Sequence, residues 1–224
     1  MARTAGVLLA ALLLGAAACT GSPAHRATSS PQGSSPATSS APGAVSYADY
    51  CEGTGNCPAG GVPASLRRPL HPPRVRSGSC PVTQPIRQVS ADFGAAQGSG
   101  PIYPVGVDAH GVLPAVGPSV PGSVYPPGWG GAKVLWVGAP TYTGPVLIRG
   151  IQLDGNSPVA FQAGGANPAL PELQLPPGSP VNVSAAGWRN WPSATLLKAA
   201  GCYAWQIDGT NFSIVVAFKA EIGR

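Results

Sequence analysis

Charged residues and histidines are scarce in this chain of 224 residues. Lys, Arg, Asp and Glu together make up 9% of the sequence, and only three histidines are present. From residue 80 onward the single histidine is His110, so acid–base chemistry has few groups available there. The sequence also lacks a Gly-x-Ser-x-Gly element and the glycine motifs that bind phosphate. It therefore carries no signature of an α/β-hydrolase or of a nucleotide-binding loop.

Long hydrophobic segments are also rare, and only residues 5–18 form one. This run of 14 residues is shorter than the roughly 20 that a membrane-spanning helix needs. Arg3 precedes it and Cys19 follows it, directly after three alanines, which is typical of a secretory signal. The segment resembles a bacterial lipoprotein signal. That resemblance implies that Cys19 is lipidated and holds the protein on the extracytoplasmic face of the cell membrane. An uncleaved anchor helix and an ordinary secretion signal are the alternatives.

Gly and Pro are abundant where charge is not. The chain has 31 glycines and 27 prolines, the two residues that most disfavour helices. Residues 20–46 are almost entirely Ser, Thr, Pro, Ala and Gly, and they have too little apolar surface to form a core. We therefore expect a signal peptide over 1–18, a lipidated Cys with a disordered tether over 19–79, and a β-sandwich domain over 80–224.

Four arginines are concentrated near the end of the expected tether, at Arg67, Arg68, Arg74 and Arg76. Such a cluster can be attracted to anionic lipid or to an anionic wall polymer. A solvated linker without a partner is the alternative, and the one we favour. We do not expect nucleic-acid binding, because residues 80–224 have nearly balanced charge and lack a basic face.

Apart from Cys19, the cysteines are Cys51, Cys57, Cys80 and Cys202. An even number in an exported chain favours disulfides, and four cysteines allow three pairings. The short spacing between the first two favours a local Cys51–Cys57 bridge, which leaves Cys80 with Cys202. A zinc site is disfavoured because the spacings are irregular and no histidine lies near a cysteine pair. We expect neither a metal nor a cofactor.

Short apolar segments recur between turn signals from residue 102 onward, as expected of strands. The best pattern alternates at Phe212, Ile214, Val216 and Phe218, and a turn joins it to residues 203–207 in a predicted hairpin. The expected strands are 102–107, 112–116, 133–138, 146–153, 158–162, 172–175, 181–184, 194–198, 202–207 and 211–219.

A second hairpin is predicted around the Asp154-Gly155-Asn156 turn, between residues 146–148 and 159–161. No amphipathic helix of ten residues or more follows the signal. Many short strands with Gly and Pro turns indicate an all-β domain, and we expect an immunoglobulin-like β-sandwich.

Residues 80–224 also resemble a set of uncharacterised lipoproteins from high-GC Gram-positive bacteria. The segments that carry the resemblance include Cys-Pro-Val-Thr at 80–83, Gly-Pro-Ile-Tyr-Pro at 100–104 and Lys-Val-Leu-Trp-Val at 133–137. They continue with Gly-Pro-Val-Leu-Ile-Arg-Gly at 144–150, Gly-Trp-Arg-Asn-Trp-Pro-Ser at 187–193 and Gly-Cys-Tyr-Ala-Trp at 201–205. The resemblance implies an immunoglobulin-like closing hairpin and assigns no activity.

Catalytic chemistry has one candidate pair, Asp108 and His110, and no nucleophile motif beside it. Aromatic residues are the better candidates for a site. Trp129, Trp188 and Trp191 are expected in loops, where tryptophans can stack on sugar rings or anchor a protein partner. The alternative, and the one we favour, is that they close the open ends of a sandwich.

We therefore expect a non-catalytic envelope lipoprotein that binds a protein or cell-wall glycan partner and reaches the membrane through Cys19. The alternative is an envelope hydrolase acting on wall polymer or peptide. Convergence of Asp108 and His110 in a cleft would favour the hydrolase, and an exposed patch of the three tryptophans would favour the binding protein.

Overall fold

The computed structural model of the chain describes residues 62–76, 78–86, 88–163, 169–178 and 182–223. Within these ranges, one short 3-10 helix, η1 (Ala64–Leu66), precedes the strands. The strands are β1 (Pro85–Ile86), β2 (Ala96–Gln97), β3 (Ile102–Val105), β4 (Val112–Ala115), β5 (Gly130–Gly138), β6 (Val146–Gln152), β7 (Val159–Gln162), β8 (Leu173–Leu175), β9 (Asn182–Val183), β10 (Arg189–Leu197), β11 (Gly201–Gly209) and β12 (Ser213–Ile222).

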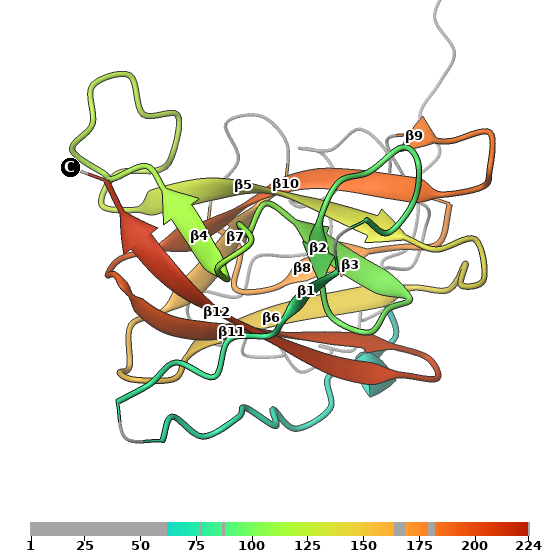
Figure 1. Cartoon of the computed structure of the whole chain (residues 1–224), viewed down its shortest axis with the longest axis horizontal. Helices are drawn as coiled ribbons and strands as arrows, with labels where there is room; N and C mark the ends of the chain where they lie inside the picture. The colour runs from blue at the N-terminus through green and yellow to red at the C-terminus, as the bar shows by residue number, and fades with distance from the viewer. Residues whose placement is uncertain (1–61, 77, 87, 164–168, 179–181, 224) are drawn as a thin grey trace, which may run out of the picture. The chain divides into compact units, whose positions relative to one another are not determined.

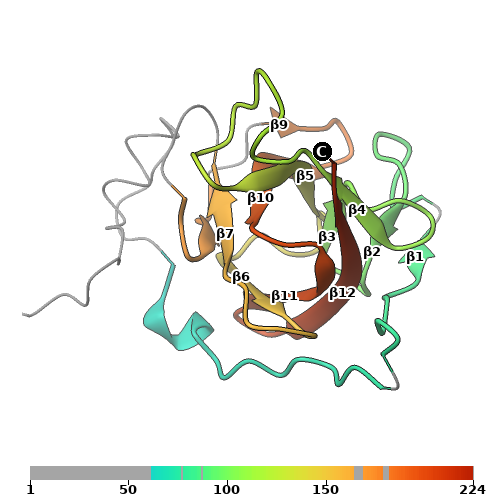
Figure 2. The ribbon, with the colours of Figure 1, turned by 90° about the vertical axis from the view of Figure 1, so that its left-hand side faces the viewer.

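Most strands belong to two sheets that pack face to face (Figures 1 and 2). The first sheet has the order β3-β5-β10-β7, and β9 pairs with β10 beside this path. The second sheet has the order β4-β12-β11-β6-β8. Neighbouring strands are antiparallel except for β4, which runs parallel to β12. The expected all-β sandwich is confirmed, and all ten expected strand segments correspond to strands of these sheets.

The hairpin of β11 and β12 follows from the alternating sequence. The two strands pair from Gly201 opposite Ala220 to Asp208 opposite Ser213, so the predicted hairpin is confirmed. Every second residue of β11 points into the sandwich, and these are Tyr203, Trp205 and Ile207. The residues between them point to the outer face of the second sheet.

The core between the sheets is built around aromatic rings. Trp136 of β5 and Trp205 of β11 are fully buried and meet edge to face, with ring centroids 5.2 Å apart. Phe218 of β12 lies 4.0 Å from Trp205, again between centroids. Burying one such side chain contributes about 1.5–3 kcal/mol. These contacts join the central strands of both sheets.

The second predicted hairpin is wrong. β6 pairs with β11 and β8 in the second sheet, whereas β7 pairs with β10 in the first. The Asp154 carboxylate in the expected turn accepts a hydrogen bond of 2.9 Å from the backbone N–H of Cys202. This bond attaches the turn to the start of β11, and the chain then crosses to the other sheet instead of folding back on β6.

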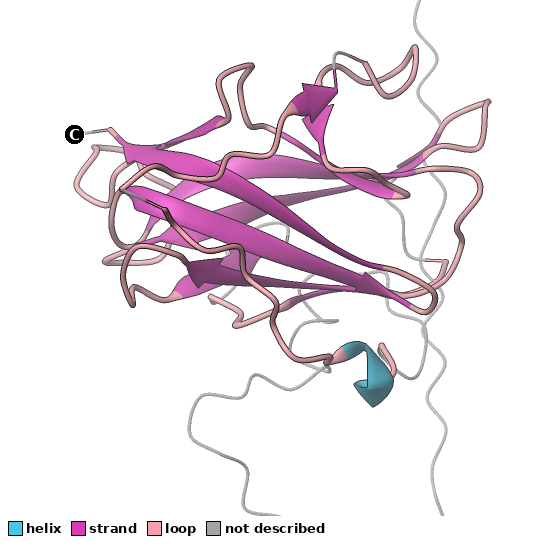
Figure 3. Ribbon diagram, turned by 60° about the horizontal axis from the view of Figure 1, so that its bottom comes forward, coloured by secondary structure: helices cyan, strands magenta, loops and turns pink. Residues whose placement is uncertain are grey.

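Residues 62–76, which the sequence analysis placed in the tether, pack against the outer face of the second sheet (Figures 1 and 3). We call this segment the strap. Val62 and Leu66 are buried against Leu147 of β6. The folded part therefore begins before residue 80, and the expected boundary is too late. The composition of the segment did not reveal this packing, because the strap is rich in proline and only a few apolar residues and arginines hold it on the sheet.

A buried carboxylate fastens the strap to the sheet. Asp208 of β11 is fully buried and accepts hydrogen bonds from Arg68 of the strap at 3.3 Å and from Arg149 of β6 at 2.8 Å. Gln206, two residues earlier on the same outward face, donates to the backbone oxygen of Pro69 and accepts from the backbone N–H of His71. The outward positions of β11 are thus polar because the strap covers them.

The predicted Cys80–Cys202 disulfide is present, with Cα atoms 5.4 Å apart. It links the chain just after the strap to the start of β11 and closes a loop with a sequence separation of 122. Cys19, Cys51 and Cys57 lie outside the described residues, so their lipidation and pairing remain predictions. No helix in the described ranges has both the length and the apolar character needed to cross a bilayer.

Candidate functional site

The possible acid–base pair proves to be a turn. Asp108 and His110 lie between β3 and β4, and the Asp108 carboxylate accepts backbone hydrogen bonds from Val112 and His110, both at 2.8 Å. The bond from Val112 is the main reason that the pKa of Asp108 lies below its usual value. Both side chains are exposed. The carboxylate shapes the turn and does not orient the imidazole in a cleft.

Four other carboxylates in the described part of the chain are held by hydrogen bonds or ion pairs. Besides Asp154 and Asp208, Glu172 pairs with Arg67 of the strap, and Glu221 pairs with Lys219 of the same strand. The two ion pairs lie in different parts of the fold. Within the described ranges, no three His, Cys, Asp or Glu side chains gather as metal ligands would.

The three tryptophans singled out from the sequence do not form one patch. Trp129 directly precedes β5, next to the end where Gly130 pairs with Leu197. Trp188 directly precedes β10, next to the opposite end of the same strand pair. A strand of this length spans roughly 30 Å, so the two indoles lie far apart. A single exposed tryptophan patch is excluded.

Trp191 is a core residue, and its expected place in a loop is wrong. It lies in β10 opposite Trp136 and is 6% exposed. The strand contains Pro192, although proline is rare in central strands. Here Pro192 falls between Asn190, which pairs with β9, and Ala194, which pairs with β7. The strand tolerates proline at this position because neither β9 nor β7 pairs with it there.

Arg189 shares the inner face of β10 with Trp191 and carries an unusual charge. The residue is 7% exposed, and its Nε and Nη2 atoms have no hydrogen-bond partner among the described residues. Burial is the main cause that lowers the pKa of this guanidinium. The carbon of the guanidinium lies 5.2 Å from the Trp191 ring centroid, so a cation–π contact offsets part of the cost of burial.

Trp129 covers part of the outer face of the first sheet. It is half-buried and packs against a small apolar cluster formed by Ala160, Ala194 and Leu196. The Lys198 ammonium lies 4.7 Å from the centre of its ring. These contacts account for the position of Trp129 without a ligand.

Trp188 belongs to a half-buried aromatic group that sequence patterns did not predict. Its ring centroid lies 6.2 Å from that of Tyr103 in β3 and 6.5 Å from that of Phe93, which precedes β2. We call Phe93, Tyr103 and Trp188 the aromatic cluster. All three side chains are only partly covered. Three separate segments therefore present aromatic surface at one place.

The surroundings of the aromatic cluster form a shaped surface on the first sheet. Tyr103 and Asn190 both pair with Val137 of β5, so these three residues form one row on the outer face. Val137 in the middle is fully buried, whereas Tyr103 and Asn190 are partly exposed. Between β9 and β10, Ser184 and Trp188 exchange hydrogen bonds that fix the turn carrying the indole.

The alternation of β3 was the signal that could have identified Tyr103. Ile102 and Pro104 are buried, which places Tyr103 on the outer face of an edge strand. Phe93 lies in a segment without periodicity, so its position could not be derived. Aromatic rings with a polar amide nearby can stack on sugar rings or receive apolar side chains of a protein.

Comparisons with known proteins give no relative of this chain. No family model matches it, and neither the curated proteins nor the solved structures include a match.

Proposed function

We propose that this protein is a non-catalytic, lipid-anchored lipoprotein of the cell envelope whose β-sandwich binds a protein or cell-wall glycan partner. The aromatic cluster is the observation that carries the proposal. Partly exposed aromatic rings held on a rigid sheet cost little entropy on binding, and they supply most of the binding energy at many interfaces.

The proposed location rests on the N-terminal sequence and is supported by the disulfide. Residues 5–18 and Cys19 have the features of a lipoprotein signal. Disulfides persist in oxidising compartments outside the cytoplasm, and the Cys80–Cys202 bridge agrees with export. The partner is therefore sought in the wall or on the membrane surface, in a high-GC Gram-positive bacterium.

We further assign the sandwich to the immunoglobulin-like class. The order β3-β5-β10-β7 corresponds to strands A, B, E and D, and β6-β11-β12 corresponds to C, F and G. β4 and β8 are additions at the two edges of the second sheet. The chain departs from antibody domains in its bridge, because Cys80 precedes the first strand of the first sheet, whereas an antibody bridge joins strands B and F.

The alternative hydrolase gains no support from the candidate residues. The Asp108 carboxylate is occupied by backbone N–H groups, and Asp208 is covered by the strap. A general base must reach the substrate proton, and neither carboxylate is placed for that.

The proposal is tested by binding of the purified full-length chain to isolated walls and membranes. We expect Trp188→Ala to weaken binding about 10- to 30-fold, as for a central aromatic contact of about 2 kcal/mol. Trp129→Ala, at the other end of the sheet, is the matched control and should bind like the wild type. Equal binding by the Trp188 variant and the wild type would overturn the proposed site.

The anchor has a separate test. Cys19→Ser should move the protein from the membrane fraction to the soluble fraction, and the wild-type N-terminal peptide should carry acyl mass. A variant that stays on membranes at the wild-type level would contradict lipidation at Cys19.

A further inference from the structure

The four arginines noted in the sequence have two different roles. Arg67 is paired with Glu172, and Arg68 is paired with Asp208, so both hold the strap on the sheet. The side chains of Arg74 and Arg76 are exposed, and neither makes an ion pair or hydrogen bond within the described part of the chain. Strap attachment therefore does not explain the second pair.

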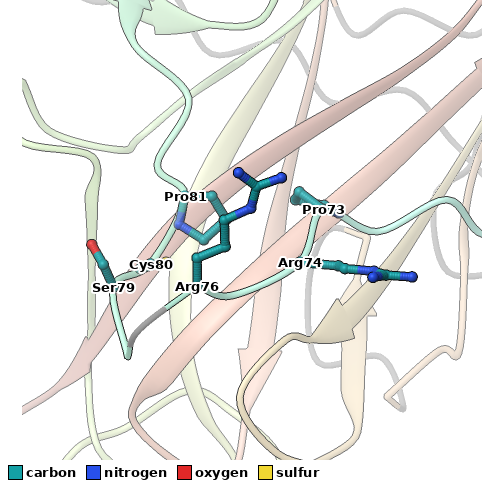
Figure 4. A pocket seen from close by; sticks show the side chains of 6 residues that line it. All are labelled: Pro73, Arg74, Arg76, Ser79, Cys80 and Pro81. Atoms are coloured by element: carbon teal, nitrogen blue, oxygen red, sulfur yellow. The ribbon is translucent and has the colours of Figure 1, made fainter.

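Arg74 and Arg76 line a surface hollow of about 420 Å³ beside the disulfide (Figure 4). The other lining residues are Pro73, Ser79, Cys80 and Pro81. Figure 4 shows the Arg76 side chain extending toward Pro73, while Arg74 extends away from the loop. The lining thus combines two cations and a serine with apolar proline rings, and none of its described residues is acidic.

Neighbouring charges only partly offset this positive surface. Lys219 of β12 stands opposite Cys202 and is the charged residue of that strand nearest the bridge. Its Nζ atom lies 2.7 Å from a carboxylate oxygen of Glu221, so this pair adds no net charge. The positive charge comes from Arg74 and Arg76, and the Asp154 carboxylate, which accepts a hydrogen bond from the Cys202 N–H, offsets part of it.

The backbone around the hollow is constrained. Proline rings fix φ at Pro73 and Pro81, and the Ser79 N–H donates to the Arg76 carbonyl at 2.9 Å. The bridge to Cys202 holds the end of the loop. A constrained loop loses little entropy when it binds, so weak individual contacts can suffice.

We infer that Arg74 and Arg76 bind the phosphate groups of anionic lipid headgroups and lay the outer face of the second sheet on the membrane. Guanidinium groups match phosphate oxygens in geometry and charge. Residues 73, 74 and 76 of the strap line the hollow, and the strap lies beside the second sheet, whereas Tyr103 of the aromatic cluster belongs to β3 in the first sheet (Figures 1 and 2). Binding of lipid through the strap side would leave the aromatic cluster turned toward a partner.

The membrane is the expected source of phosphate because of the proposed anchor at Cys19, on which this inference rests. About 40 residues separate Cys19 from the strap. A flexible chain of that length has a root-mean-square span of roughly 35 Å. The flexible tether proposed from the composition of residues 20–46 would hold the domain at millimolar effective concentration near the headgroups, where two basic residues are enough for appreciable docking.

The test uses the full-length chain in uncharged maltoside micelles and follows the Nε–Hε NMR signals of the arginines. Micelles doped with phosphatidylglycerol should shift the signals of Arg74 and Arg76 and leave that of Arg149 in place. Phosphatidylcholine at the same mole fraction should give little shift. Inorganic phosphate is the third probe and should need far higher concentrations.

Backbone amide signals of Gly78 and Ser79 report the effect of variants. Arg74→Gln with Arg76→Gln should require about 30-fold more phosphatidylglycerol for the same shift. Lys133→Gln with Lys198→Gln removes the same charge from the other sheet and should titrate like the wild type. If both double variants need equally more phosphatidylglycerol, net charge alone explains the effect, and the inference is overturned.

Two further outcomes would also overturn it. One is an equal response to phosphatidylglycerol and phosphatidylcholine, and the other is a response to inorganic phosphate without one to doped micelles. Repeating the titration on the Cys19→Ser chain separates the two proposals, since the micelle supplies the headgroups whether or not Cys19 is lipidated. Loss of membrane localisation in cells with an intact titration would support both the anchor and the phosphate site.

Discussion

Replacing Asp208 with Asn should loosen the strap and destabilise the domain. The carboxylate is fully buried and receives hydrogen bonds from Arg68 and Arg149. Breaking a buried ion pair costs about 3–5 kcal/mol when the remaining charge is fully buried. The side chains of Arg68 and Arg149 are 31% and 18% exposed, and an amide oxygen can still accept one bond. We therefore expect a loss of about 2–3 kcal/mol, which lowers Tm by roughly 5–10 °C.

The pH dependence of this loss identifies its cause. Burial raises the pKa of Asp208, but hydrogen bonds from Ser213, Gln206 and the two arginines outweigh burial, so the pKa lies below the usual 3.8. A carboxyl with a depressed pKa in the folded state stabilises the protein above its unfolded pKa of about 3.9. That contribution disappears as pH falls through the folded pKa. The difference between wild type and Asp208→Asn should be full at pH 6–7 and shrink below about pH 4.

Denaturant unfolding of the full-length chain at several pH values measures both effects. Glu172→Gln is the control, because it removes a more exposed ion pair with Arg67 and should cost no more than about 1 kcal/mol. Limited proteolysis should cut the strap faster in the Asp208 variant than in the control. An Asp208→Asn variant within about 0.5 kcal/mol of wild type at pH 7 would refute the role assigned to this network.

Three other substitutions test the disulfide bridge, a core residue and the buried charge one at a time. Cys202→Ser should cost about 4–5 kcal/mol, as the chain-entropy model gives for a loop of this length, and an unchanged denaturation midpoint would contradict that. Trp191→Ala should cost about 3–5 kcal/mol as a core truncation, so a fully stable variant would place this indole outside the core. Arg189→Met should leave stability unchanged or raise it, because it removes a buried cation that has no anionic partner within the described ranges; a loss above about 2 kcal/mol would show that a partner exists.

Sequence patterns predicted the sandwich well because its strands carry local signals. The alternation around Trp205 and Val216 fixed both the hairpin and the face that enters the core. The same reasoning failed at Asp154, because a turn signal describes four residues and does not say which strand will pair next. The choice between pairing β6 with β7 or with β11 depends on contacts distant in sequence.

The strap and the aromatic cluster were hidden for a similar reason. Arg68 and Asp208 are 140 residues apart, and nothing in either segment marks the other as its partner. Tyr103 and Trp188 likewise come from distant segments that the first sheet brings together. Trp191 was expected in a loop, and only the sheet topology shows that it lies in β10 opposite Trp136. Local patterns therefore predicted strands, whereas sites made across strands required the structure.

Side-chain footprinting by hydroxyl radicals tests the proposed function most directly. The full-length protein is labelled alone and when bound to isolated walls or membranes, and oxidation is measured at each aromatic residue. A binding site at the aromatic cluster predicts that Phe93, Tyr103 and Trp188 become protected on binding while Trp129 stays equally reactive. Protection confined to Trp129, or no change at Trp188 in protein shown to be bound, would contradict the proposed binding surface.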